Sequence, residues 1–98
     1  MSQTVKQRFH AIVEGKVQGV SFRFYTVQFA RNLDVTGWVR NLPDGTVEVV
    51  AEGPREHLDG LIEYLHEGPP DAHVKRVNAR WEAATGDFTA FSIRYNGH

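Results

Sequence analysis

The order in which two hydrophobic periods follow each other constrains this chain more than any single motif does. Apolar residues recur at every second position, the pattern of strands buried on one face, in residues 9–14, 35–41, 46–52, 74–83 and 91–95. They recur at helical spacing in residues 22–33 and 58–65. The sequence therefore predicts the order β-α-β-β-α-β, followed by a short terminal strand.

Local signals mark the ends of these predicted elements. Ser21 is expected to cap the first helix, and Pro43-Asp44-Gly45 predicts a turn that joins two strands into a hairpin. Gly53-Pro54 stands where the second helix can begin, and Gly68-Pro69-Pro70 ends it. These end signals thus agree with the order of strands and helices that the hydrophobic periods predict.

Two amphipathic helices must bury their apolar faces against the sheet. The stripe predicted for the first helix consists of Phe22, Tyr25, Phe29, Ala30 and Leu33. Right-handed crossovers place both helices on the same side. We therefore expect an α+β, ferredoxin-like sandwich with an antiparallel sheet and two helices on one face. A length of 98 residues suits a single domain, 1–98, in which about residues 1–6 form a disordered tail.

Composition argues against several functional classes. Lys and Arg number 11 against 12 Asp and Glu, so the net charge of −1 gives no bulk attraction to nucleic acid or to an anionic membrane. The chain has no cysteine, which excludes disulfides and thiol nucleophiles, and its five histidines lack metal-ligand spacing. No stretch reaches transmembrane length. We expect a cytoplasmic monomer.

The segment from Gly15 to Arg23 is suited to binding an anion. Gly15 and Gly19 permit positive φ, and the amides of a loop that enters a helix N-terminus can converge on phosphate oxygens. Arg23 falls in the first helical turn, where a cation opposes the helix dipole at a cost of about 0.3–1 kcal/mol. A residue that breaks a local rule is a candidate functional residue, and a guanidinium can hold two phosphate oxygens. The side chains of Lys16 and Gln18 are expected to point into water.

Asn41 ends the second predicted strand on the same face as Gly37 and Val39, which should be the face that the helices cover. A carboxamide there costs free energy unless it finds hydrogen-bond partners. Two interpretations stay open. Asn41 either caps the turn that follows, or offers one acceptor and two donors that orient a water molecule.

Two motifs resemble the signatures of the acylphosphatase family. The first is Val13-Glu14-Gly15-Lys16-Val17-Gln18-Gly19-Val20-Ser21-Phe22-Arg23, and the second is Gly37-Trp38-Val39-Arg40-Asn41, followed by Gly45, Val47 and Gly53 at the expected intervals. Length and element order also agree, so the similarity covers essentially the whole chain. The resemblance implies a hydrolase that splits the carboxyl–phosphate bond of small acyl phosphates into a carboxylate and inorganic phosphate, without a metal or a cofactor.

The resemblance also assigns roles to residues. It implies that Arg23 binds the phosphoryl group and that Asn41 positions the attacking water. The remaining phosphate contacts would come from the amides of Gly15, Lys16, Val17, Gln18, Gly19 and Val20. Inorganic phosphate or sulfate is expected as a ligand of the same pocket. Such a site suffices for catalysis because an acyl phosphate has a good leaving group. A loose transition state for phosphoryl transfer needs mainly positioning of the reactants and stabilisation of charge.

Two other functions fit the same fold. A nucleic-acid-binding module would stack bases on aromatic residues of the open sheet face, but the charge balance argues against it, and Trp38 and Trp81 are expected to be packing residues. A non-catalytic phosphate-binding module would keep the pocket and lack turnover. Only an activity measurement separates that module from the enzyme.

Overall fold

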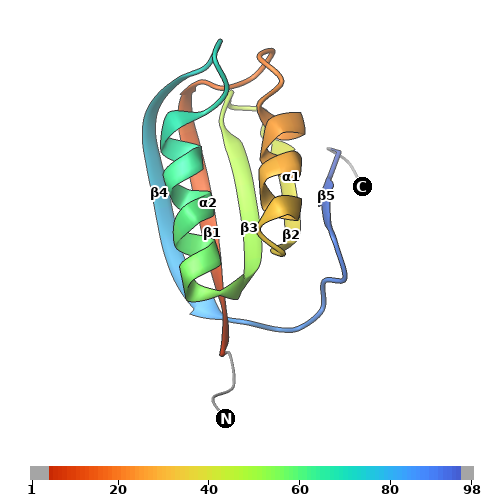
Figure 1. The fold of residues 1–98 in the computed structure, drawn as a ribbon. Coiled ribbons are helices and arrows are strands. Elements are labelled where there is room, and N and C mark those ends of the chain that lie inside the picture. The colour runs from red at the N-terminus through yellow and green to blue at the C-terminus, as the bar shows by residue number, and fades with distance from the viewer. Residues whose placement is uncertain (1–4, 96–98) are drawn as a thin grey trace.

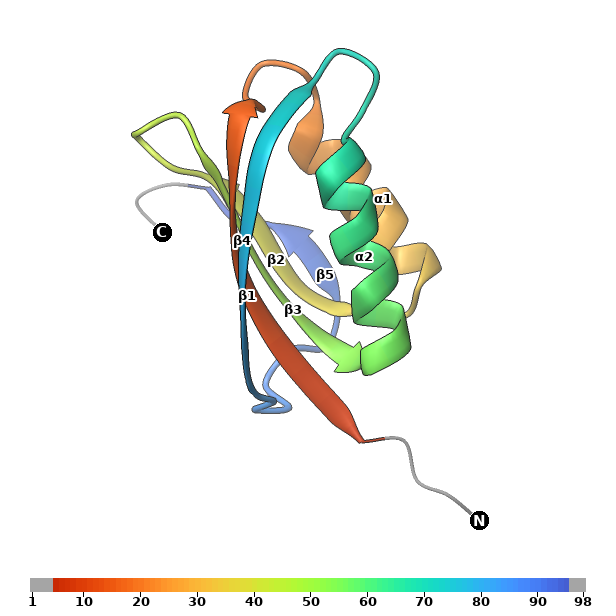
Figure 2. The same ribbon diagram turned by 90° about the vertical axis from the view of Figure 1, so that its left-hand side faces the viewer.

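The computed structural model describes residues 5–95. Its elements follow the predicted order: β1 (Lys6–Lys16), α1 (Phe22–Asn32), β2 (Thr36–Asn41), β3 (Val47–Pro54), α2 (Arg55–Glu67), β4 (His73–Ala83) and β5 (Phe91–Ile93). The strands form one sheet in the order β4-β1-β3-β2-β5. Figures 1 and 2 show both helices on one face of the sheet, which is the ferredoxin-like arrangement expected from the sequence. Residues 1–4 of the predicted tail lie outside the described residues, and β1 begins at Lys6.

The sheet is mixed, and the prediction of a wholly antiparallel sheet was wrong. The pairs β1–β3, β1–β4 and β2–β3 are antiparallel, but β5 runs parallel to β2, with Gly37 opposite Phe91 and Val39 opposite Ile93. The cause is the connection after β4, which crosses from one edge of the sheet to the other along a single end of the molecule (Figure 1). The chain therefore enters β5 from the same end as β2. β5 ends at Ile93, so Tyr95, expected in this strand, lies beyond it.

The hydrophobic core lies between the sheet and the helices. Its fully buried side chains include Phe9, Ala11 and Val13 of β1, Val47, Val49 and Ala51 of β3, and Leu58, Leu61 and Leu65 of α2. The alternation along β1 and the helical spacing along α2 thus face the side that the sequence predicts. In β4 the predicted alternate positions are not buried: Val77 is half-buried, and Ala79 and Trp81 are exposed.

The buried face of α1 differs from the predicted stripe. Phe22 and Ala30 are buried as expected, but Thr26 and Val27 are buried as well, and Tyr25 is 44% exposed. Residues 22, 26 and 30 follow one another at four-residue spacing and turn toward the sheet. Tyr25 falls on the flank of the helix. Hydrophobic spacing alone did not show which flank of the stripe the sheet covers.

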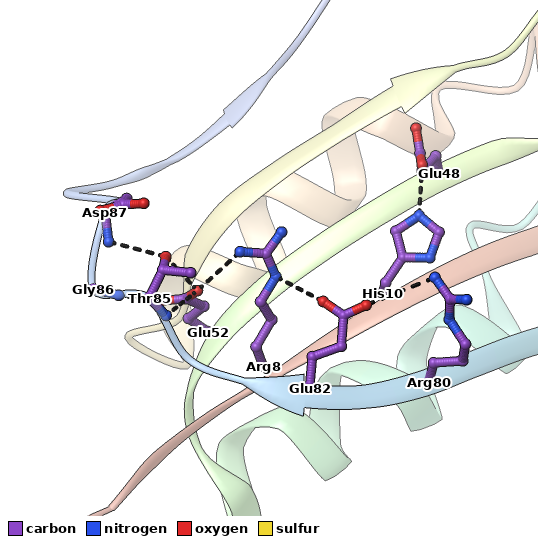
Figure 3. A network of polar contacts seen from close by, with 9 residues as sticks. All are labelled: Arg8, His10, Glu48, Glu52, Arg80, Glu82, Thr85, Gly86 and Asp87. Carbon is purple, nitrogen blue, oxygen red and sulfur yellow. Dashed lines mark hydrogen bonds and ion pairs between the residues drawn. The ribbon is translucent and has the colours of Figure 1, made fainter.

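A buried carboxylate holds the connection between β4 and β5 in place. Glu52 of β3 is 2% exposed and accepts hydrogen bonds from the amide of Thr85 (2.9 Å), the hydroxyl of Thr85 (2.9 Å) and the amide of Gly86 (3.0 Å). Arg8 of β1 adds an ion pair at 3.3 Å (Figure 3). Burial raises the pKa of Glu52, but these hydrogen bonds and the charge of Arg8 outweigh burial, so the pKa lies below its ordinary value. The charged form of Glu52 therefore anchors the segment that leads to β5.

Trp38 is a packing residue, as expected, because only 9% of it is exposed. The guanidinium carbon of Arg94 lies 4.3 Å from its ring centroid, and that of Arg40 lies 5.2 Å away. Trp81 is 38% exposed, and the guanidinium of Arg55 lies 3.7 Å from its ring. Each tryptophan thus has at least one guanidinium group over its ring.

Candidate active site

A pocket of about 410 Å³ opens where the chain passes from β1 into α1. Three segments that are distant in sequence line it, through Val17, Gln18, Gly19, Ser21, Phe22, Arg23, Phe24, Asn41 and Ile93. Figure 2 shows the β1–α1 connection and the β2–β3 turn at the same end of the molecule. The fold therefore joins the two motifs that the sequence singles out.

The backbone of the β1–α1 connection leaves its amides available. Gly19 (φ 74°) and Ser21 (φ 63°) are both left-handed, and Phe22 after them is helical. Left-handed residues that alternate with residues of negative φ form a concave arrangement of N–H groups that suits an anion. Among residues 5–95, no main-chain carbonyl accepts a hydrogen bond from an amide of residues 17–24. These N–H groups can therefore converge on a ligand.

Ser21 occupies the N-cap position of α1, but its side chain makes no capping hydrogen bond, so the expected capping role was wrong. A capping serine normally has an extended backbone, whereas the left-handed backbone of Ser21 directs its side chain elsewhere. This conformation costs a non-glycine residue roughly 1–2 kcal/mol. It leaves the first-turn amides of α1 without an internal acceptor.

Arg23 lies in the first turn of α1, as predicted, and no acidic residue accompanies it there. Within residues 5–95 it forms no ion pair, although five other arginines do. Its guanidinium carbon lies 5.6 Å from the ring centroid of Tyr95. A cation at a helix N-terminus without a described carboxylate beside it adds positive charge to the pocket and remains available to an anionic ligand.

Asn41 is the last residue of β2, and its Oδ1 is buried without a hydrogen-bond partner among the described residues. Leaving a buried acceptor unpaired costs about 1–3 kcal/mol. The turn that follows is held by other groups: the amide of Leu42 donates to Thr46 O at 2.9 Å, and Asp44 Oδ1 accepts from the amide of Thr46 at 3.0 Å. Asn41 takes no part in this turn. Asn41 instead lines the pocket.

Gln18 does not point into water, so the prediction of a solvated side chain was wrong. Its Nε2 donates two hydrogen bonds of 2.8 Å, to the carbonyl oxygens of Leu42 and Thr46. These bonds tie the β1–α1 connection to the turn beside Asn41. The sequence offers no sign of them because both acceptors are main-chain atoms.

Three residues of the predicted phosphate loop do not line the pocket: Gly15, Lys16 and Val20. Gly15 lies inside β1, so its placement in a loop was wrong, and it sits at a bulge in the pairing with β4. Its φ is 129°, and a Cβ atom there would stand 2.1 Å from the carbonyl oxygen of His73. The strand pairing therefore requires glycine at this position for packing reasons.

The sequence did not single out Phe24 and Ile93 as pocket residues. Phe24 follows Arg23 at the start of α1, and its proximity to a predicted site residue was the one available signal. Ile93 reaches the pocket only because β5 pairs parallel to β2, which the sequence did not predict. Among residues 5–95, no cluster of three or more His, Cys, Asp and Glu side chains is arranged to bind a metal ion. Neither helix in this part of the chain is long and apolar enough to cross a membrane.

Comparisons with known proteins agree with the resemblance of the two motifs. A family model described as Acylphosphatase matches residues 9–93. The acylphosphatase of Salinibacter ruber is 48% identical over 94 residues, covering 96% of this chain and 99% of the relative. That of Marinobacter nauticus is 56% identical over 84 residues, covering 86% and 91%. The solved structure of an acylphosphatase from Coxiella burnetii superposes with a TM-score of 0.89 at 43% identity, covering 96% of this chain and all of that one.

Proposed function

The chain belongs to the acylphosphatase family, and we propose that it acts as that family's name states, as a hydrolase (EC 3.6.1.7) of acyl phosphates. In the proposed reaction, the oxygen of a water molecule attacks phosphorus and the bond between phosphorus and the carboxyl oxygen breaks. The carboxylate leaves with the bonding electron pair. The proton lost by the water goes to an oxygen of the substrate's own phosphoryl group, so the products are a carboxylate and inorganic phosphate.

Arg23 and the amides of the β1–α1 connection hold the phosphoryl group in this proposal. A guanidinium can bind two phosphoryl oxygens at once, and converging amides can bind the third. Both kinds of group stabilise the charge that spreads over the equatorial oxygens in the transition state. The main-chain contribution is proposed for residues 17–22, since Gly15 and Lys16 belong to β1.

Asn41 orients the attacking water in this proposal. Its buried Oδ1 can accept a hydrogen bond from the water, and its Nδ2 can donate to the water or to a phosphoryl oxygen. Fixing the nucleophile in line with the breaking bond removes much of the entropic part of the barrier. No covalent intermediate is needed, because the acyl phosphate carries a good leaving group.

One observation carries the proposal. Asn41, whose Oδ1 is a buried acceptor without a partner among the described residues, lines the same pocket as Arg23, a cation without an ion-pair partner among residues 5–95. Packing does not satisfy a buried acceptor, and the contact of Arg23 with the Tyr95 ring does not neutralise its charge. A phosphoryl group and a water molecule supply the partners that both lack.

The test is hydrolysis of benzoyl phosphate in the presence of a chelator, followed by the loss of its aromatic absorbance. We expect turnover far above the buffer rate and competitive inhibition by inorganic phosphate or sulfate. Absence of turnover would refute the proposed enzymatic activity, and phosphate binding without turnover would favour a non-catalytic phosphate-binding module. Loss of turnover on adding the chelator would refute the metal-free reaction.

We propose further that the protein works as a cytoplasmic monomer on small-molecule acyl phosphates, without nucleic acid or membrane partners. The balanced charge of 11 basic against 12 acidic residues gives no bulk attraction to nucleic acid or to an anionic membrane, which supports the absence of those partners. Light scattering at micromolar concentration, with and without phosphate, tests the monomer. A dimer mass would contradict it.

A further inference from the structure

Part of the pocket lining is apolar. Phe22, Phe24 and Ile93, here called the apolar wall, stand beside the polar groups of Gln18 and Arg23. Phe22 is 2% exposed and serves the core, whereas Phe24 is 55% exposed although it lines the pocket. The protein itself therefore leaves most of the Phe24 ring uncovered at this site.

The pocket is larger than the reaction centre requires. Its volume of about 410 Å³ lies within the range of pockets that enclose whole small-molecule ligands. A phosphoryl group held by Arg23 and the loop amides fills the polar part. The rest of the substrate, the acyl group, must then lie along the remaining lining.

The ring of Phe24 is held in a defined orientation. It meets the ring of Tyr25 edge to face, with centroids 5.6 Å apart and planes at 78°. This geometry is favourable for aromatic pairs, so it restricts the freedom of an otherwise exposed side chain. An oriented, exposed ring gains free energy when an apolar group covers it.

The charges of the lining narrow the choice of acyl group. Arg23 is the one cationic residue among the lining residues, and no carboxylate is among them. The phosphoryl group engages Arg23, so a second anionic or a cationic group on the acyl chain finds no opposite charge in this lining. The lining therefore offers the acyl group no ion-pair partner, whereas the exposed Phe24 offers it apolar surface.

We propose that Phe24 is a specificity-determining residue, whose ring contacts the acyl group and favours aromatic or extended apolar acyl phosphates over acetyl phosphate. This inference rests on the proposed hydrolysis of acyl phosphates at the same site. Phe24 takes no part in bond breaking. It ranks substrates by the apolar surface that they bury against it.

The first experiment compares kcat/KM for benzoyl phosphate with kcat/KM for acetyl phosphate in the parent protein and its variants. The two substrates differ in intrinsic reactivity, so the quantity to follow is the change in this ratio from parent to variant. We expect Phe24→Ala to lower the ratio about fivefold to tenfold, within the range found for lost apolar contacts in binding pockets. Phe24→Leu, which keeps apolar surface, should lower it less.

Tyr25→Phe is the matched control. Tyr25 is the adjacent residue and is also exposed, but it does not line this pocket. Phenylalanine keeps the ring that meets Phe24 edge to face. The ratio should stay within twofold of the parent value. An unchanged ratio in Phe24→Ala, or an equal fall in Tyr25→Phe, overturns the proposal.

A second experiment is independent of turnover. Phenacylphosphonate and acetonylphosphonate have the shapes of benzoyl and acetyl phosphate, but a methylene group replaces the bridging oxygen and prevents hydrolysis. Calorimetry should show tighter binding of phenacylphosphonate, with the preference reduced in Phe24→Ala. If the parent protein binds phenacylphosphonate more tightly but hydrolyses neither acyl phosphate, the proposed hydrolysis is refuted and the proposed contact of Phe24 with the acyl group is supported. If the parent protein hydrolyses both acyl phosphates and Phe24→Ala keeps the binding preference, the proposed contact is refuted and the proposed hydrolysis is supported.

Discussion

The side-chain amide of Gln18 donates a hydrogen bond of 2.8 Å to the carbonyl oxygen of Leu42, the residue that follows Asn41. A second bond of 2.8 Å reaches the carbonyl oxygen of Thr46 on the other side of the same turn. The loop proposed to hold phosphate is thereby joined to the strand end that carries Asn41. We therefore expect Gln18 to act through other groups, as a positioning residue that sets the separation between the proposed positions of the phosphoryl group and the water.

Replacing Gln18 by alanine should impair both catalysis and stability. We expect Gln18→Ala to lower kcat for benzoyl phosphate by about tenfold or more, because small displacements of reacting groups have large effects on rate. The free energy of unfolding should fall by only about 1–3 kcal/mol, since two hydrogen bonds are lost. Steady-state kinetics and urea unfolding measure the two effects separately.

Asn78→Ala is the control for this experiment. Asn78 is also an amide that bonds across the sheet, to Glu14 Oε2 at 3.5 Å, but it is exposed and lies outside the pocket. It should leave kcat unchanged. If Gln18→Ala left kcat unchanged as well, the positioning role would be excluded.

Arg23 should tolerate neither alanine nor lysine. An ammonium group is a point charge on a flexible stem, and it does not reproduce the two parallel hydrogen bonds of a guanidinium. We expect both variants to lose phosphate inhibition together with turnover, with kcat/KM reduced at least a hundredfold, as for other preorganised charge-stabilising groups. The inhibition constant for phosphate and kcat/KM test this. A lysine variant with near-parental kcat/KM would show that charge alone suffices.

Asn41 should separate binding from chemistry. We expect Asn41→Ala to lose most of its turnover while it still binds inorganic phosphate, because the guanidinium and the loop amides remain. The unfolding free energy should fall little or rise, since the substitution removes a buried acceptor without a described partner. Phosphate titration by calorimetry and turnover of benzoyl phosphate are the two measurements. Parental turnover in this variant would rule out the role in orienting water.

The two glycines of the first motif should respond differently to substitution. Gly15→Ala forces a Cβ atom to within 2.1 Å of the His73 carbonyl oxygen, so we expect severe destabilisation or failure to fold. At Gly19 an added Cβ meets nothing within 4 Å, and the cost is mainly that of alanine at φ 74°, roughly 1–2 kcal/mol. Gly19→Ala should therefore fold and lose phosphate affinity. Thermal unfolding and phosphate titration distinguish the two, and a stable Gly15→Ala protein would contradict the packing explanation.

Glu52 should make stability depend on pH in the acid range. Its pKa is lowered in the folded state, so its stabilising effect is complete above the ordinary glutamate pKa of about 4.3 and is lost as pH falls through the folded-state pKa. Glu52→Gln should lower the unfolding free energy at pH 7 by about 2–4 kcal/mol, because an amide cannot accept all of these hydrogen bonds or pair with Arg8. Its stability should also fall less steeply below pH 4 than that of the parent protein.

Glu63→Gln, an exposed change on α2, is the control for Glu52→Gln. It should follow the parent's pH profile. Urea unfolding between pH 3 and pH 7 gives the unfolding free energy against pH for the parent protein and for both variants. Identical slopes for Glu52→Gln and the parent protein would remove Glu52 as the source of the acid sensitivity.

Much of the fold follows from the sequence because hydrophobic periods and turn residues act locally. The five strands and two helices are found in the predicted order, and the buried faces of β1 and α2 are the predicted ones. The direction of β5 was not predictable in this way. It depends on where Glu52 fixes Thr85 and Gly86, which is a contact between residues far apart in the chain.

The same distinction holds for the candidate site. Arg23 was predicted as a site residue because it opposes a helix dipole, and Asn41 because it interrupts an apolar face. The structure brings both residues into one pocket. The prediction that the Gln18 side chain points into water was wrong because its hydrogen-bond acceptors are main-chain carbonyl oxygens of another turn. No local sequence pattern indicates such partners for a glutamine in a loop. Gly15 was placed in the loop because the β-bulge that requires it forms only when β4 pairs with β1.

Because Ile93 reaches the pocket through β5, the pocket lining is complete only after residues near the end of the chain have paired with β2. The first motif leaves the ribosome early, and Asn41 follows it, but Ile93 emerges last of the three. A nascent chain whose residues 84–93 still occupy the exit tunnel lacks one side of its pocket.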